Sequence, residues 1–258
     1  MSKNVGEYDE LRIKLRLIEL RDAHKEVVIS GKKFQIQSVS LHREFDALPK
    51  GTNLQTMTDN DIEKLANKVG AGKAKRNDKA DVKINGVGYS VKSHRSAPPA
   101  IVNHTPRCGW YRICKELNID IAPLDAMANE YFRLREDGVI GEDMLNTNPL
   151  SPFAKNKEYL RPLINYFLFK GTGDKASPNP ASYILDCKDP YDISQWKIDD
   201  EFQYFDKYWN DMKFSFRNKG FTSYPYKAPK SLWKNAVCKP WAKTFDGKLK
   251  GSLHVRVI

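Results

Sequence analysis

Three side chains in the stretch KADVKINGVGYSVK, residues 79–92, are of types that act together on a phosphodiester: Asp81, Ser90 and Lys92. A carboxylate holds a hard divalent cation such as Mg²⁺, which takes oxygen ligands and keeps several waters. Such a cation polarises the phosphate and acidifies the attacking water, and a lysine orients that water and offsets developing charge. On one shared face, these groups suit metal-dependent phosphodiester hydrolysis. The alternative is an ordinary solvated charge pair between Asp81 and Lys92.

The register of a hairpin decides whether these side chains share a face. Asn85-Gly86 between two alternating strands predicts a two-residue type I′ turn. Counting from that turn, one face pairs Ile84 with Val87, Val82 with Tyr89 and Ala80 with Val91, and the other pairs Lys83 with Gly88, Asp81 with Ser90 and Lys79 with Lys92. The first face is wholly apolar and must be buried. The hydrophobic pattern alone therefore predicts that the polar side chains project together.

Regular elements must position this hairpin. Residues 7–22 carry two neighbouring apolar stripes at helical spacing, which predicts a helix buried against more than one neighbour. Two β-rich runs around Ser30-Gly31 predict a hairpin. Residues 59–69 predict a second helix that begins after Thr58. We expect the catalytic hairpin to lie among these elements.

The C-terminal half mixes both kinds of element. Residues 158–169 and 201–216 predict helices, the second rich in aromatic residues, and residues 182–187 and 252–258 predict strands. Pro149 and Pro152 suggest a boundary. We therefore expect an α/β fold, with α+β as the alternative: residues 1–148 form a catalytic core, and residues 149–258 an α/β part that packs on it and contacts DNA.

Composition restricts the class of protein. The net charge of +11 and the pI near 9.3 favour a polyanionic partner, because Lys and Arg that neutralise phosphates release counterions; a basic protein whose charge only keeps it soluble is the alternative. There is no apolar run long enough to span a bilayer and no export signal, which predicts a cytoplasmic protein. The four cysteines form no CxxC pairs, which predicts free, mostly buried thiols.

The catalytic stretch resembles the core strand pair of PD-(D/E)XK nucleases, which carry an acid on the first strand and (D/E)-x-K on the second. Here the second element is Ser90-Val91-Lys92, so serine replaces the acid. Further stretches are similar, in the same order, to HpaII-like restriction endonucleases: GEYDELRIKLRLIELRD, VGYSVKSHRSAPPAIVN, YFLFKGTGDK, FSFRNKG and GSLHVRV. They reach from residue 6 to residue 257, so the resemblance covers nearly the whole chain.

This resemblance implies a PD-(D/E)XK core, a mixed β-sheet flanked by helices. It also implies a type II restriction endonuclease that makes Mg²⁺-dependent double-strand cuts at a short palindromic DNA site, with CCGG as the first guess. Two alternatives remain: a repair or recombination nuclease that uses the same hairpin, and a DNA-binding protein without enzymatic activity. A homodimer, which would cut both strands in one encounter, is possible.

Ser90 cannot anchor a cation as a carboxylate does, so a second acid is needed beside Asp81. Glu10 is the first choice, because it lies on the N-terminal helix that the resemblance places beside the catalytic sheet. Glu7 and Glu63 follow in that order. The alternative for Glu10 is an i,i+4 ion pair with Lys14.

Candidate DNA-binding residues come from two loops and two alternating stretches. They are Ser93, His94, Arg95, Asn103, Arg217, His254 and Arg256, with His104 beside them. Arginine clamps phosphates and reads guanine in the major groove. Exposed polar loops and a solvated edge strand are the alternatives. Phe214 and Phe216 alternate with polar residues and are expected to fill core.

Overall fold

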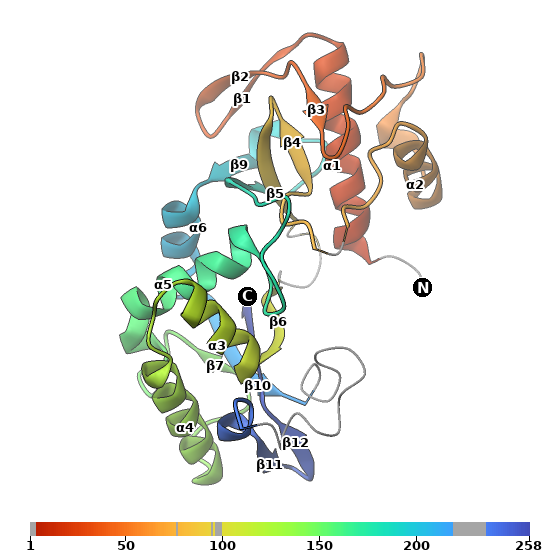
Figure 1. Cartoon of the computed structure of the whole chain (residues 1–258). Helices are drawn as coiled ribbons and strands as arrows, with labels where there is room; N and C mark the ends of the chain where they lie inside the picture. Colours follow the sequence, from red (N-terminus) through yellow and green to blue (C-terminus); the bar gives the residue numbers. More distant parts are fainter. Residues whose placement is uncertain (1–3, 76, 94, 96–99, 219–235) are drawn as a thin grey trace. The chain divides into compact units, whose positions relative to one another are not determined.

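The computed structural model describes residues 4–75, 77–93, 95, 100–218 and 236–258 (Figure 1). The chain forms two compact units: unit 1 is residues 1–97 and 177–204, and unit 2 is residues 98–176 and 205–258. Both contain helices and sheets, so the mixed α/β class is confirmed. The division differs from the expected single boundary near residue 148, because the chain passes between the units three times.

A five-stranded mixed sheet forms the centre of unit 1. Its order is β3-β4-β5-β8-β9, with β3 at Val39–Ser40, β4 at Val82–Ile84, β5 at Val87–Ser93, β8 at Tyr183–Cys187 and β9 at Trp196–Asp199. Strands β5 and β8 are parallel, and the other neighbours are antiparallel. Helix α1 (Val5–Asp22) packs against β3 and β5 and also against α2 (Asp59–Lys68). The hairpin predicted at Ser30-Gly31 is present as β1 (Glu26–Ile29) and β2 (Lys32–Gln35).

Helix α1 is buried on nearly all sides, as its two apolar stripes predict. Asn4 begins it with a capping box, in which Asn4 and Glu7 satisfy one another's backbone N–H groups. Its apolar side chains at Leu11, Ile13, Leu15, Leu17, Ile18 and Leu20 are all buried. Asp9 and Lys14 are buried with them. Charged side chains inside a protein need partners, and these two have partners in the site described below.

The β4–β5 hairpin has the predicted turn and, near it, the predicted register. Asn85 and Gly86 both have positive φ, 51° and 81°, as a type I′ turn requires. The ladder pairs Ile84 with Val87, Lys83 with Gly88 and Val82 with Tyr89. Farther out the predicted pairing fails. The backbone N–H of Asp81 also donates to the carbonyl of Tyr89, at 2.8 Å, and those of Lys79 and Ala80 donate to Asn179. Two successive residues, Asp81 and Val82, thus lie opposite the single residue Tyr89, which is the arrangement of a β-bulge.

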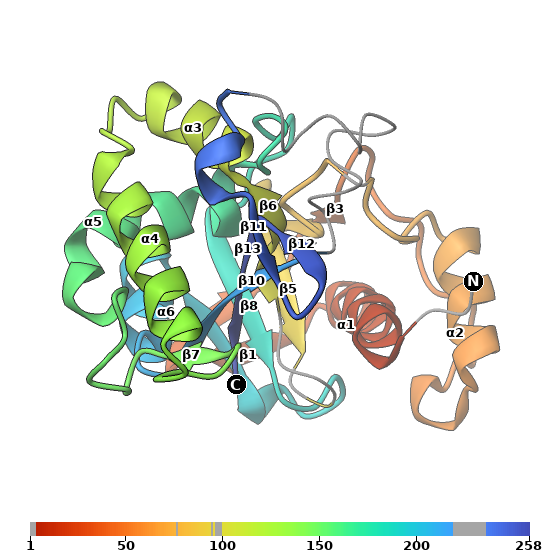
Figure 2. The same cartoon turned by 90° about the horizontal axis from the view of Figure 1, so that it is seen from below.

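Unit 2 is built on a four-stranded sheet with an aromatic core. The order is β6-β13-β10-β7, with β6 at Ala100–Pro106, β13 at Ser252–Val257, β10 at Met212–Arg217 and β7 at Met144–Leu145. Figure 2 shows helices α3 (Arg107–Glu116), α4 (Ala122–Glu136) and α5 (Lys157–Asn165) on one side of this sheet. Phe214 and Phe216 are fully buried, which confirms their core role.

Shorter elements complete the chain. They are the hairpin of β11 (Lys243–Phe245) and β12 (Lys248–Lys250), a π-helical turn at Tyr166–Lys170, and 3₁₀ turns at Leu54–Thr56, Ala154–Asn156, Ile193–Gln195 and Lys239–Trp241. The helix expected over residues 201–216 was wrong in its second half. Helix α6 covers only Glu201–Tyr208, and the chain then enters β10, whose Phe214 and Phe216 alternate as in a strand.

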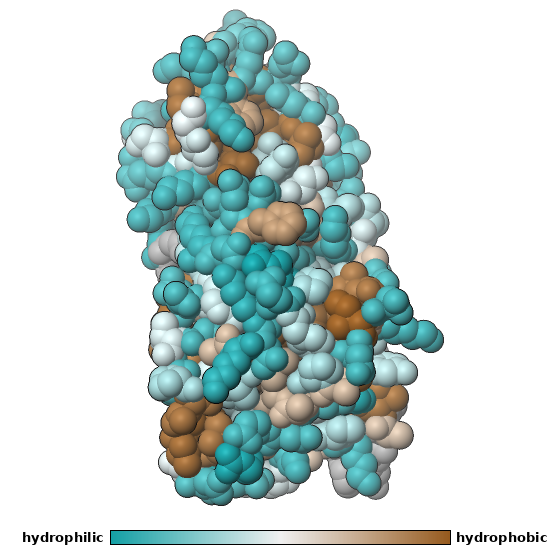
Figure 3. Space-filling view, turned by 90° about the vertical axis from the view of Figure 1, so that its left-hand side faces the viewer, coloured by the Kyte–Doolittle hydropathy of each residue, from teal (hydrophilic) through white to brown (hydrophobic). Residues whose placement is uncertain are grey.

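The composition also bears on helix hydrophobicity, surface polarity and the cysteines. None of the described helices is long and apolar enough to cross a bilayer. The face in Figure 3 is mostly hydrophilic, and its apolar areas are separated from one another. All four cysteines are free, three of them buried.

Candidate active site on the β4–β5 hairpin

Asp81 is held in a fixed orientation at the start of the hairpin. Its Oδ2 accepts the backbone N–H of Val91 at 2.7 Å and the hydroxyl of Ser90 at 3.3 Å. Ser90 is buried, with 3% of its surface exposed. The bulge therefore leaves Asp81 beside Ser90, although the simple register has ended. Only one carboxylate oxygen is engaged by these bonds, so the other can face a ligand.

Burial and a second carboxylate raise the pKa of Asp81 to about 6. Burial is the larger cause, and the negative charge of Glu10 is the next. The positive charges of Lys92 and Lys14 act in the opposite direction. Glu10 and Lys92, predicted from sequence to meet Asp81, are thus near enough to change its protonation. A bound cation would offset the effect that the charge of Glu10 has on Asp81.

Glu10 comes from α1 and forms the ion pair that was its alternative interpretation. Lys14 Nζ donates to Glu10 Oε1 at 2.6 Å and to the carbonyl of Gly72 at 3.0 Å. The Lys14 side chain is fully buried, whereas 15% of the Glu10 side chain is exposed. The ion pair and the approach to Asp81 therefore coexist. Of the other acids considered, Glu7 caps α1 and pairs with Lys73, and Glu63 lies on α2.

A second lysine lies close to Lys92. Burial and the charge of Lys92 lower the pKa of Lys79 to about 8, while Asp81 acts the other way. The predicted pairing of Lys79 with Lys92 is absent from the ladder, although the charge of Lys92 acts on Lys79. Lys92 is in parallel register with Asp186 of β8, which is buried. Sequence reasoning missed Asp186, since nothing in a sequence announces a parallel partner so distant in the chain.

Two residues predicted to contact DNA, Ser93 and Arg95, bind a buried acid in the structure. Ser93 Oγ donates to Asp9 Oδ2 at 2.5 Å, and Arg95 Nε donates to the same oxygen at 2.9 Å. Arg95 also pairs with the second oxygen of Asp9, which is fully buried. This contact ties α1 to the segment after β5. Sequence analysis did not identify Asp9, because it assigned the functional acid of this helix to the neighbouring Glu10. His94 lies outside the described residues.

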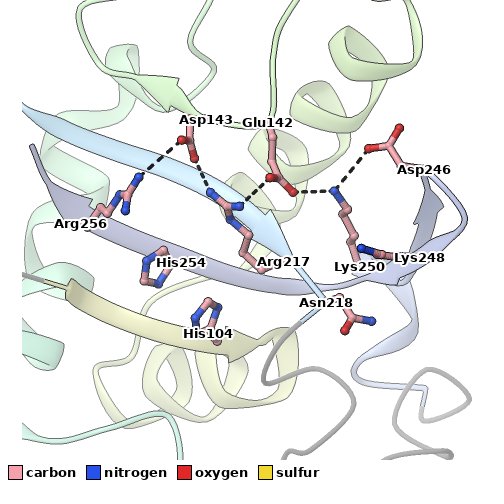
Figure 4. A pocket seen from close by; sticks show the side chains of 10 residues that line it. All are labelled: His104, Glu142, Asp143, Arg217, Asn218, Asp246, Lys248, Lys250, His254 and Arg256. Carbon is pink, nitrogen blue, oxygen red and sulfur yellow. Dashed lines mark hydrogen bonds and ion pairs between the residues drawn. The ribbon is translucent and has the colours of Figure 1, made fainter. Parts of the chain in front are cut away.

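The other candidate DNA-binding residues belong to unit 2. Arg217, His254 and Arg256 line one pocket together with His104 (Figure 4). Asn103 is exposed on β6. The pairing of β10 with β13 brings Arg217 and the β13 residues together. Sequence analysis predicted that these residues lie on polar faces of strands, but it could not predict that the two strands pair.

The candidate metal ligands, Asp81 of the hairpin and Glu10 of α1, are carboxylates, which suit Mg²⁺ rather than a soft transition metal. Among residues 4–75, 77–93, 95, 100–218 and 236–258, no group of three or more His, Cys, Asp and Glu side chains is placed to hold a metal ion. Mg²⁺ at phosphoryl-transfer sites needs only one or two carboxylates, because phosphate and water supply the rest. Asp81 and Glu10 are the two carboxylates that could supply them.

Comparisons of the chain with protein families, with curated proteins and with solved structures find no match.

Proposed function

We propose that the chain is a Mg²⁺-dependent endonuclease with a PD-(D/E)XK core in unit 1, acting as a type II restriction enzyme on double-stranded DNA. The observation that carries the proposal is the grouping of Asp81, Glu10 and Lys92. They come from a hairpin and from a helix that is far away in the chain but packs against β5, and the charges of Glu10 and Lys92 both act on Asp81. The mixed sheet with α1 packed against it is consistent with such a core.

Each side chain has a defined part in this proposal. Asp81 and Glu10 hold the cation, and Val91 N–H and Ser90 Oγ fix the orientation of Asp81. Bound Mg²⁺ would polarise the scissile phosphate and lower the pKa of a water. Lys92 orients that water and offsets the negative charge that builds up on the phosphate.

Lys14 belongs to the same arrangement. Its buried ammonium donates to Glu10 and holds the carboxylate in place on α1 before a cation binds. A carboxylate that is already placed costs less to reorganise when a cation arrives. The buried ion pair therefore serves to prepare the site rather than to stabilise the fold.

The test is digestion of unmodified supercoiled plasmid with Mg²⁺ and, in parallel, with EDTA. Discrete bands with Mg²⁺ alone support a restriction enzyme, whereas a repair nuclease would nick or degrade without discrete sites. Lys92→Ala is expected to reduce the rate by several orders of magnitude while DNA binding remains. Lys33→Ala is the matched control, because Lys33 is 75% exposed on β2 of the same unit. Cleavage by Lys92→Ala near the wild-type rate would show that the catalytic assignment is wrong.

A further inference from the structure

The pocket of unit 2 is an open cavity of about 860 Å³ on the polar face of its sheet. Figure 4 shows side chains from β6, β10 and β13 pointing into it, with acids from the segment before β7 above them. Nothing in the proposed chemistry of unit 1 uses these residues. The pocket therefore needs a role of its own.

The charges that line this pocket are mixed. Arg217, Lys248, Lys250 and Arg256 supply four cations. Glu142, Asp143 and Asp246 supply three acids. In a site that bound only phosphates, cations would increase the affinity and carboxylates would decrease it. The edge of a base pair, in contrast, offers both acceptors and donors: arginine donates to O6 and N7 of guanine, and a carboxylate accepts from N4 of cytosine.

Two of the four cations, Arg217 and Lys250, are held in place by acids. Arg217 bonds to Glu142 at 2.5 Å, to Asp143 at 2.5 Å and to Ser215 at 2.9 Å. Lys250 bonds to Glu142 at 2.5 Å. Fixed side chains of this kind lose little further freedom when a ligand binds.

Two neighbouring side chains on β13 retain unused polar atoms. Arg256 approaches Asp143 only at 3.6 Å, which is beyond hydrogen-bond distance. Within the described part of the chain, buried Nε of Arg256 and buried Nδ1 of His254 have no hydrogen-bond partner. Buried polar groups without partners are uncommon in folded proteins. A ligand that carries both donors and acceptors would satisfy both atoms.

Backbone geometry directs a second imidazole to the same place. His104 has a positive φ of 48° at a register shift between β6 and β13. This conformation is unfavourable for a residue other than glycine. The His104 ring stacks on His254, with centroids 4.3 Å apart and planes 10° from parallel. Burial is the largest cause that lowers the pKa of His254; a backbone hydrogen bond with Val102 opposes it, and the charges of Arg217 and Arg256 lower the pKa further. In a neutral ring whose other nitrogen bonds to the backbone, Nδ1 is left as an acceptor.

We propose that this pocket reads base-pair edges in the major groove of DNA, with Arg256 and His254 as the contacting residues and Arg217 held by acids beside them. The inference rests on the proposed function, since it names the part of the chain that selects the site to be cut. Arg256 is assigned a guanine, the base that arginine recognises best.

The experiment selects bound duplexes from a randomised library with wild-type protein, in EDTA and in Ca²⁺. Affinities of the selected and a scrambled duplex are then measured over a range of salt concentrations. Arg256→Ala and His254→Ala are expected to bind the selected duplex about 10–100-fold more weakly and to bind the scrambled duplex unchanged. The slope of log K against log salt should not change. Arg256→Lys keeps the positive charge, so a change in its binding is not due to loss of charge or to misfolding. This variant should also lose the base preference at one position of the selected sequence.

Arg133→Ala is the matched control, because Arg133 is 58% exposed on α4 of the same unit. An equal loss on both duplexes with a shallower slope would identify a phosphate contact and overturn the inference. Unchanged binding by both alanine variants, or no selected sequence for the wild type, would also overturn it. Selection without cleavage contradicts the proposed function alone. Cleavage by Arg256 variants with an unaltered sequence preference contradicts this inference alone.

Discussion

At the scale of single residues, the candidate active site works against the stability of its own fold. Asp81 is ionised at neutral pH in a place that raises its pKa to about 6 from an ordinary value of 3.8. The folded chain then holds this proton more tightly than the unfolded chain. The ionised carboxylate therefore destabilises the fold above about pH 6, and this effect shrinks as the pH falls toward 4. Functional sites commonly carry such a cost.

Asp81→Asn is accordingly expected to be more stable than the wild type at pH 8, by on the order of 1–3 kcal/mol. The difference should disappear near pH 4, where both side chains are neutral. Mg²⁺ should raise the melting temperature of the wild type and leave that of the variant unchanged. Thermal melting between pH 4 and pH 8, with and without Mg²⁺, measures both effects. A less stable variant at pH 8 would contradict the assigned destabilisation.

Glu10 has two partners, and variants can separate them. Glu10→Ala leaves Lys14 buried without its carboxylate, so a loss of about 3 kcal/mol in unfolding free energy is expected. Adding Lys14→Met should recover much of that loss, since an apolar side chain of similar length fills the space. Cleavage should stay strongly impaired in the double variant. Denaturant unfolding and plasmid digestion of the two variants provide the comparison, and a double variant that cuts normally would remove Glu10 from the site.

Ser90→Glu extends this test, because residue 90 lies beside Asp81. Placed in the Glu10→Ala/Lys14→Met background, it is expected to restore partial, Mg²⁺-dependent cleavage. The half-maximal Mg²⁺ concentration should fall relative to the double variant. No restoration together with a large loss of stability would mean that the buried position has no room for the longer side chain, and melting curves distinguish that case.

At the scale of elements, α1 contributes successive residues to two different contacts. The charge of Glu10 acts on Asp81 of the hairpin, whereas Asp9 binds Ser93 and Arg95. The same helix thus fixes both the catalytic face of the sheet and the segment that follows it. A shift of α1 would disturb both contacts, and the packing of its two buried apolar stripes opposes such a shift.

Arg95→Ala tests whether this contact is structural or binds DNA. If Arg95 mainly compensates Asp9, the variant should lose about 2 kcal/mol in unfolding free energy, because a fully buried carboxylate loses its cation. Arg16→Ala is the control on the same helix, where loss of the pair with Glu19 should cost about 0.5 kcal/mol or less. A stable Arg95→Ala protein with weakened DNA binding would instead favour the sequence-based assignment.

Sequence patterns predicted single helices and turns better than they predicted which distant segments those elements contact. The Asn85-Gly86 turn and helix α1 follow from local rules, because turn chemistry and helical periodicity act within a few residues. The bulge at Asp81 does not, since it depends on Asn179, which pairs with the backbone of Lys79 and Ala80. The proximity of Glu10 to Asp81 followed only from the family resemblance.

At the scale of the whole molecule, the interleaving of the units explains the misplaced boundary. Parallel pairing of β5 with β8 joins Tyr89 to Tyr183, and the chain between them forms much of unit 2. Parallel strands require a long crossover, and here the crossover contains residues 98–176 of unit 2. Prolines at 149 and 152 therefore lie inside unit 2 rather than between domains. No local signal in the sequence reports a crossover of that length.

The net charge of +11 sets an upper limit on how strongly salt should weaken binding to scrambled duplex DNA. Each phosphate neutralised by Lys or Arg adds about −0.9 to the slope of log K against log salt. Contacts by the whole excess charge would give about −10. Many described cations are paired with acids, Arg217 and Arg161 among them. A negative slope shallower than about −10 is therefore expected. Fluorescence anisotropy between 50 and 200 mM NaCl, roughly the range over which such contacts weaken, measures it, and affinity independent of salt would contradict a nucleic-acid partner.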